Sequence, residues 1–203
     1  MWSLQKPNAD AVRRFLAAQS VASPASGFSY AEVGATRGDA MPPAVAARYN
    51  VDVNRVCLGH GERAFVAACE ALRNWTMFPA PWTKILPERA PLETGTTVAM
   101  LAQVYGLWWL NACRIVYTID ETAPVRRFGF AYGTLEAHVE TGEERFSVEW
   151  HADDSVWYDL RAFSQPRYPL VKLAKPLARM QQRRFARESK VAMQRAVAEA
   201  GRA

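Results

Sequence analysis

The stretch that decides the fold runs from Phe128 to Phe163 and reads FGFAYGTLEAHVETGEERFSVEWHADDSVWYDLRAF. Apolar and polar residues alternate through most of it, which is typical of antiparallel strands with one buried face. Thr141-Gly142 predicts a two-residue hairpin turn, and Asp153-Asp154-Ser155 predicts a three-residue turn. The stretch therefore predicts a meander of three antiparallel strands, over residues 128–140, 144–151 and 156–163.

These two turns decide which side chains share a face of the sheet. One face would be apolar and would carry Gly133, Leu135, Ala137, Phe146, Val148, Trp150, Tyr158, Leu160 and Ala162. The other face would be polar and would carry His138, Arg145, Ser147, Glu149 and Asp159. Because both hairpins place their apolar residues on the same side, the two registers support each other.

The segments on either side of the meander complete an α+β fold. Apolar, β-branched and aromatic residues predict strands over 28–34, 97–105 and 107–119. Helical periodicity predicts a short N-terminal helix over 10–20. It also predicts a helix over 62–75 whose buried stripe consists of Phe65, Ala68, Cys69 and Leu72. A long helix over 168–198 is expected at the C-terminus.

This C-terminal helix is amphipathic. Its apolar stripe consists of Leu170, Leu173, Ala174, Leu177, Phe185, Ala192 and Ala196, and the opposite side carries Lys172, Lys175, Arg179, Arg183 and Lys190. Such a helix must bury its stripe, so we expect it on the concave face of a curved sheet. Leu177 would then face Leu135, Val148 and Leu160. Gln181, Arg184 and Glu188 fall inside the stripe and would either line a cavity or extend past the sheet into solvent.

The order of elements resembles the helix-grip fold of the START and Bet v 1 proteins, in which a curved antiparallel sheet grips the last helix. That resemblance implies an apolar cavity between the sheet and the helix.

A second resemblance is carried by the residues themselves. The matching motifs are Phe28-x-Tyr30-x-x-Val-Gly34-x-Thr36, Leu58-Gly-x-Gly61, Ala71-Leu-x-x-Trp75, Pro81-Trp82, Arg127-Phe-Gly-Phe-Ala-Tyr-Gly-Thr-Leu135, His138, Gly142-Glu-Glu-Arg-Phe146, Val156-Trp-Tyr158 and Phe163-Ser164. Together they resemble an uncharacterised family of bacterial and plant proteins known as domain of unknown function nineteen-ninety. The resemblance covers residues 28–195 and implies no reaction, cofactor or catalytic residue.

The composition is that of an ordinary globular protein. With 203 residues, of which 50% are apolar and 22% charged, the chain is expected to form one domain over 1–203 with a core over 28–195. Three cysteines form no even framework, and there is no signal peptide, so we expect reduced thiols and a cytoplasmic location. The apolar run Thr97–Leu110 is shorter than the roughly 20 residues of a membrane helix, so no transmembrane segment is expected.

The charge is concentrated at the C-terminus. Residues 166–203 carry +8, whereas residues 1–165 carry −3, which gives the net charge of +5. A basic helix can dock on nucleic acid or on an anionic membrane. Because no aromatic reader lies among its basic residues, a solvated helix face accounts for them and no nucleic-acid partner is expected.

Two groups of residues are candidates for a functional site. His138 and Glu149 could form an acid–base pair on the polar sheet face; the alternative is a solvated outer face with ordinary ion pairs. The aromatic row Phe128, Phe130 and Tyr132 could line a ligand site or belong to the core. The residues expected to bind a ligand are Phe128, Phe130, Tyr132, Leu135, Val148, Trp150, Tyr158, Leu177 and Gln181.

The motifs indicate no metal or cofactor. Cys57-x-x-His60 with Cys69 matches no standard zinc spacing, and Gly59-His-Gly61 lacks the remaining residues of a phosphate-binding loop. Neither G-x-S-x-G nor H-E-x-x-H occurs.

Three functions follow from these candidates. The first is a binding protein that holds a small hydrophobic or amphipathic molecule between the sheet and the C-terminal helix. The second is an enzyme in the same cavity, in which His138 and Glu149, with Asp120 or Tyr117 as further candidates, perform acid–base chemistry. The third is an interaction protein that uses the basic helix. The residues favour binding over catalysis.

Overall fold

The protein is described by a computed structural model, which covers residues 1–20, 27–78, 81–167 and 175–202. In chain order its elements are β1 (Trp2–Ser3), α1 (Ala9–Ser20), α2 (Pro43–Arg48), β2 (Asn50–His60), α3 (Gly61–Arg73), β3 (Thr83–Leu86), β4 (Thr97–Val104), β5 (Leu107–Glu121), β6 (Arg126–Thr134), β7 (Glu140–Trp150), β8 (Ser155–Pro166) and α5 (Lys175–Ala200).

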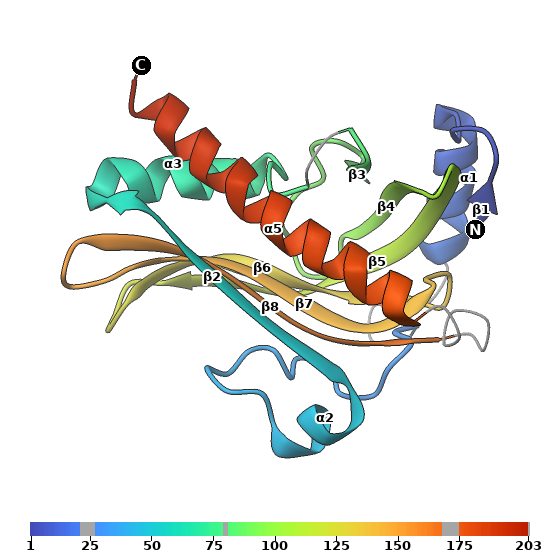
Figure 1. The fold of residues 1–203 in the computed structure, drawn as a ribbon, viewed down its shortest axis with the longest axis horizontal. Helices are drawn as coiled ribbons and strands as arrows, with labels where there is room; N and C mark the ends of the chain where they lie inside the picture. Colours follow the sequence, from blue (N-terminus) through green and yellow to red (C-terminus); the bar gives the residue numbers. More distant parts are fainter. Residues whose placement is uncertain (21–26, 79–80, 168–174, 203) are drawn as a thin grey trace.

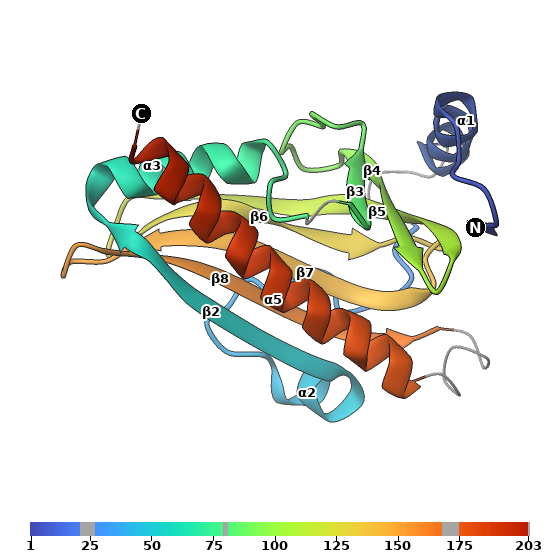
Figure 2. The ribbon, with the colours of Figure 1, turned by 45° about the horizontal axis from the view of Figure 1, so that its top comes forward.

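All eight strands form one antiparallel sheet. Its order is β2-β8-β7-β6-β5-β4-β3, and β1 pairs separately with β5. The sheet is curved, and both α3 and α5 lie across its concave face (Figures 1 and 2). The prediction of an α+β fold, in which a curved antiparallel sheet holds a long C-terminal helix, is therefore confirmed.

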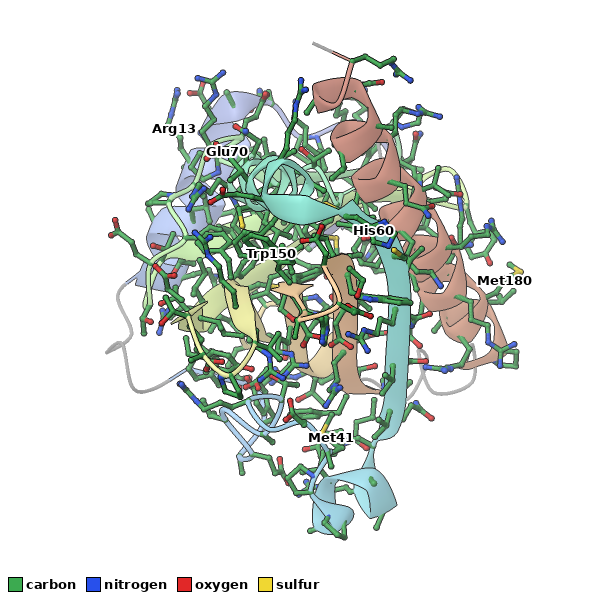
Figure 3. The ribbon with its side chains drawn as sticks, turned by 90° about the vertical axis from the view of Figure 1, so that its left-hand side faces the viewer. Arg13, Met41, His60, Glu70, Trp150 and Met180 are labelled. Carbon is green, nitrogen blue, oxygen red and sulfur yellow. The ribbon has the colours of Figure 1, made fainter. Side chains whose placement is uncertain are left out.

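The main core lies between α3 and the concave face. Phe65, Ala68, Cys69 and Leu72 form the predicted stripe on α3 and are all buried. They belong to the same apolar cluster as the fully buried Phe130, Phe146, Val148 and Tyr158 of the sheet. Figure 3 shows Trp150 at this end of the sheet, and its ring lies 5.9 Å from that of Phe65. Half of the concave face is thus filled by a helix that follows directly after β2.

The predicted hairpin at Thr141-Gly142 is wrong. Phe130 pairs with Phe146, and Phe128 with Val148, so residues 135–139 make the connection and Gly142 lies within β7. A Cβ atom on Gly142 would lie 1.9 Å from the carbonyl oxygen of Phe163. Glycine is therefore required here by the close approach of β8, not by a turn.

The corrected register changes the apolar face of β6. Phe128, Phe130 and Tyr132 now share the concave face with Phe146 and Val148, in place of Gly133, Leu135 and Ala137. The second hairpin keeps its predicted faces, because Val148 pairs with Tyr158 and Phe146 with Leu160.

The outer face of the sheet is polar but not solvated. Its residues Arg145, Ser147, Glu149 and Asp159 are buried, because the segment that contains α2 covers this face (Figure 1). Arg145 donates to Asp159 at 2.8 Å and to the carbonyl oxygen of Thr36 at 3.1 Å. The alternative of an exposed, weakly paired ladder is therefore wrong.

Residues 28–34 do not form the strand that was expected. Phe28 makes one isolated bridge with Leu135, and the segment continues in turns. It is held instead by the buried carboxylate of Glu143, which accepts hydrogen bonds from the Tyr30 hydroxyl at 2.8 Å and the Gly34 N–H at 2.7 Å. The Thr36 N–H donates to the same carboxylate at 3.0 Å.

The buried side of α5 differs from the predicted stripe. Phe185 and Ala196 of that stripe pack against the core, but the buried residues of the helix are Ala186, Ser189, Met193 and Val197. Leu177 is 47% exposed, so its predicted place over Leu135, Val148 and Leu160 is wrong. The reason is that α5 crosses the sheet obliquely, and its N-terminal half does not reach α3 (Figure 2). Leu170, Lys172, Leu173 and Ala174 lie outside the described residues.

The run Thr97–Leu110 forms β4 and the beginning of β5, as expected for buried strands. Among the described helices, none combines the length and the apolar character needed to cross a membrane. The predicted N-terminal helix is present as α1, which packs through Val12 on Leu101 and Leu110.

Candidate functional site

A cavity of about 770 Å³ lies between the N-terminal half of α5 and the part of the sheet that α3 leaves uncovered. Strands β2, β8, β7, β6, β5 and β4 supply its floor and walls, and α5 forms its roof. Sites for small molecules in proteins typically have volumes of about 300–1,000 Å³. The cavity is therefore large enough for a drug-sized molecule.

Several aromatic side chains stand in the walls of the cavity. Phe78, Trp82, Trp109 and Phe185 line it, and the rings of Phe78 and Phe185 lie 5.2 Å apart. Trp82 is anchored from α5, because its indole N–H donates to Glu188 at 2.6 Å and the guanidinium of Arg184 lies 4.4 Å from its ring centroid. These contacts give the cavity rigid apolar sides.

One row of residues crosses the floor from strand to strand. Asp52 on β2 pairs with Ala162 on β8, Ala162 with Glu144 on β7, and Glu144 with Tyr132 on β6. All four line the cavity. The small side chain of Ala162, together with Gly142 in the neighbouring row, leaves the space that larger side chains would fill.

Two glutamates of β7 face the cavity because alternate residues of a strand share a face. Glu144 accepts a hydrogen bond from the Tyr132 hydroxyl at 2.8 Å, and burial raises the pKa of Glu144 to about 8. Glu140 accepts two hydrogen bonds from the Gln182 amide, at 2.8 and 2.9 Å. Burial also raises the pKa of Glu140, although the Gln182 hydrogen bonds oppose that shift.

Most cations around the cavity are already engaged or exposed. Arg179 forms a two-point ion pair with Asp52, at 2.5 and 2.7 Å. Lys190 donates to Asn54 at 3.4 Å. Arg183 and Arg187 lie at the rim and are exposed.

Only some of the predicted ligand-binding residues line the cavity. Tyr132, Leu177 and Gln181 do so, and Gln181 donates to the Tyr105 hydroxyl at 3.2 Å. The others lie outside the cavity lining, most of them in the core that α3 covers; they are Phe128, Phe130, Leu135, Val148, Trp150 and Tyr158. The aromatic row is therefore core at Phe128 and Phe130 and borders the cavity only at Tyr132.

The structure does not bring His138 and Glu149 together. His138 is buried beside the cavity, where its Nδ1 accepts the Glu140 N–H at 2.9 Å, and burial lowers its pKa to about 4. Glu149 lies on the outer face, 2.7 Å from Arg55 and 3.1 Å from His151. The further candidates are also elsewhere: Tyr117 bonds Thr36 under the outer face at 2.8 Å, and Asp120 is exposed.

The described residues contain no group of three His, Cys, Asp or Glu side chains placed to hold a metal ion. All three cysteines are free, and Cys57 donates to the carbonyl oxygen of Gly59 at 3.6 Å.

Four residues of the cavity were not expected there from the sequence: Glu140, Glu144, Asp52 and Arg179. A signal for Glu144 was present, because it is in phase with Phe146, Val148 and Trp150 on the apolar side of its strand. A charged residue in such a position is costly to bury and points to a polar site. No comparable signal marks Arg179 or Asp52.

Relatives of the chain occur in distant organisms. A UPF0548 protein of Dictyostelium discoideum is 36% identical over 159 residues, which cover 73% of this chain and 73% of the relative. A UPF0548 protein of Deinococcus radiodurans is 36% identical over 200 residues, which cover 92% of this chain and 94% of the relative.

Solved structures match the chain at low sequence identity. The crystal structure of the hypothetical protein jhp0584 from Helicobacter pylori matches with a TM-score of 0.52 and 16% identity, over 74% of this chain and 88% of that one. The crystal structure of Ara h 8.0201 matches with a TM-score of 0.42 and 11% identity, over 74% of this chain and 99% of that one.

A family model covers most of the chain. It spans residues 29–192, which include the corrected β6–β7 hairpin, the cavity floor and most of α5. The protein therefore belongs to the family described as a domain of unknown function, DUF1990.

Proposed function

We propose that the protein binds a small amphipathic molecule in the cavity between α5 and the sheet. The observation that carries this proposal is a cavity of about 770 Å³ with aromatic side chains in its walls and two half-buried glutamate carboxylates on its floor. Few, well-placed polar groups in a largely apolar cavity are characteristic of sites that orient a small ligand.

The packing around the cavity supports a preformed site. Fully buried side chains of the core adjoin it on one side, and the Arg179–Asp52 ion pair ties its roof to its edge. A ligand that enters a preformed cavity does not have to order the protein, so less binding free energy is lost.

A neutral fluorescent dye tests the proposal directly. N-phenyl-1-naphthylamine should bind the wild-type protein saturably with one site per chain. Ala162→Phe places a large side chain on the cavity floor and should weaken dye binding at least tenfold. Ala47→Phe, on the exposed side of α2, makes the same substitution away from the cavity and should leave dye binding unchanged. Equal dye binding by all three proteins would reject the cavity as the site.

An acid–base enzyme in the same cavity is a second candidate. It is favoured by Glu144, whose pKa of about 8 lies near neutrality and whose carboxyl group contacts the Tyr132 hydroxyl. His138 and Glu149 do not support it, because they lie apart. A molecule that co-purifies with the protein decides between the two candidates. Recovery of that molecule unchanged after long incubation supports binding, whereas conversion that stops in Glu144→Gln supports catalysis.

A further inference from the structure

The floor of the cavity carries more acidic than basic side chains. Asp52 and Arg179 neutralise each other in a two-point ion pair. Glu140 and Glu144 receive hydrogen bonds from uncharged donors, the Gln182 amide and the Tyr132 hydroxyl. Within residues 1–20, 27–78, 81–167 and 175–202, no ion pair joins either glutamate to a cation.

A half-buried carboxylate that pairs with no cation is unfavourable, because it gives up part of its hydration without gaining a close Coulombic partner. This cost raises the pKa of Glu144 and also that of Glu140, where the Gln182 hydrogen bonds and the charge of Arg179 oppose the shift. The exposed guanidinium groups of Arg183 and Arg187 do not relieve it, since solvent screens charges at the rim.

The space beside Glu144 is suited to a small polar group. Ala162 lies between Asp52 and Glu144 in the cross-strand row, and its methyl group leaves the floor open at this point. An ammonium group placed over Ala162 would have a carboxylate on either side of it. Its hydrogen-bond donors would reach the Glu144 carboxylate, which has no ion-pair partner among the described residues, whereas the Asp52 carboxylate is already paired with Arg179.

We propose that this cavity binds a cationic amphiphile, whose protonated primary amine pairs with Glu144 over Ala162 while its apolar body contacts the aromatic walls. This inference rests on the proposed function and adds the chemical class of the ligand. A carboxylate ligand would be repelled by Glu144 once that group is ionised, and an alcohol would gain hydrogen bonds without the Coulombic attraction.

Binding should be linked to pH through Glu144. The titratable groups around it are Tyr132 on β6, Glu140 on β7, Asp52 on β2, Tyr158 on β8 and Cys113 on β5, with Arg179 on α5. The pKa values of Tyr132, Tyr158 and Cys113 are all raised by burial, so these groups remain neutral between pH 6 and 8. In this range Glu144 is therefore the group whose pKa, about 8, lies near the solution pH, whereas His138 in the cavity lining stays neutral because burial lowers its pKa to about 4.

The sign of the effect follows from the protonation state. Below its pKa of about 8, Glu144 is mostly protonated in the free protein. Pairing with an ammonium group requires the ionised form, so binding releases a proton and tightens as the pH rises from 6 to 8. One released proton corresponds to up to about tenfold in affinity for each pH unit.

The experiment compares three probes of equal chain length by calorimetry: decylamine, 1-decanol and decanoic acid. In the wild-type protein at pH 8, decylamine should bind at least tenfold more tightly than decanol, and decanoate most weakly. Decylamine affinity should rise with pH, whereas decanol affinity should stay constant. Glu144→Gln should remove the rise of decylamine affinity with pH and weaken decylamine binding at pH 8 at least tenfold. The affinity for decanol should stay unchanged. Glu93→Gln, an exposed carboxylate away from the cavity, is the matched control.

The outcomes separate this inference from the proposed function. If decanol binds as tightly as decylamine, and neither depends on Glu144, the cavity binds apolar chains but the amine inference is wrong. If neither the three probes nor the neutral dye binds, both the amine inference and the proposed function are wrong. The comparison of probes in the wild-type protein does not depend on the folding of any variant.

Discussion

Arg179 on α5 and Asp52 on β2 form an ion pair with two contacts, at 2.5 and 2.7 Å, across the edge of the cavity. Both side chains are partly buried, with 22% and 24% of their surface exposed. The pair joins the helix that roofs the cavity to the edge strand of the sheet, so it is placed to control how easily the roof moves.

Removing either partner should speed ligand exchange more than it lowers stability. We expect Asp52→Asn and Arg179→Gln each to raise the dissociation rate of the neutral dye several-fold, and each to cost about 1 kcal/mol or less of unfolding free energy. Stopped-flow displacement and chemical denaturation measure the two quantities. In a double-mutant cycle the combined variant should behave like either single variant. Strictly additive effects on the rate would show that the two residues act independently.

Leu177 and Leu72 should respond differently to the same truncation. Leu72 is fully buried on the side of α3 that faces the core, so Leu72→Ala should cost about 2–5 kcal/mol. Leu177 is 47% exposed at the cavity, so Leu177→Ala removes few packing contacts and should cost less than about 1 kcal/mol. Urea denaturation of both variants checks the contrast. A loss above about 2 kcal/mol for Leu177→Ala would place that side chain in a packed core.

Glu144→Gln should stabilise the protein at alkaline pH. The folded-state pKa of about 8 lies above the unfolded value of 4.5, so the folded protein holds a proton that the unfolded chain releases. The stability that this group contributes is complete below pH 4.5 and is lost as the pH rises to about 8. Glutamine does not titrate, and the unfolding free energy of the variant relative to wild type should therefore increase between pH 5 and pH 8. A constant difference across this range would mean that Glu144 is ionised in the folded protein.

The three cysteines should react at different rates. Cys69 and Cys113 are buried, and burial raises the pKa of Cys69 to about 11 and that of Cys113 further. Because the thiolate is the reactive form, both should be labelled slowly by a thiol reagent at pH 8. Cys57 is only partly buried and should account for the first, fast phase of labelling. Cys57→Ser should abolish that phase, and its persistence would mean that a buried thiol is reached through local opening.

Much of the architecture could be predicted from the sequence because its causes are local. Alternation along β7 and β8 placed Phe146, Val148, Tyr158 and Leu160 on one face, as the structure confirms. The stripe on α3 was readable for the same reason, since the 3.6-residue period is a property of the segment itself. The helix–sheet layering then followed from the need to bury both apolar faces.

The register between β6 and β7 and the burial of the outer sheet face could not be predicted in this way. Thr141-Gly142 has the composition of a turn, yet Gly142 is needed because the backbone of Phe163 on β8 approaches it. The polar row that includes Arg145 and Asp159 has the pattern of a wet face. It is dry because a segment from far earlier in the chain supplies the Thr36 carbonyl and other partners.

The cavity was decided by tertiary structure alone. The sequence by itself determined that an amphipathic helix would lie on an apolar sheet face, because each pattern repeats within its own element. It did not determine that α3 would fill one half of that face, or that α5 would cross the other half obliquely. Because of those placements, Tyr132 and Glu144 line the cavity and Phe130 lies in the core. The placements depend on packing between segments that are distant in the sequence, so no pattern within one segment predicts them.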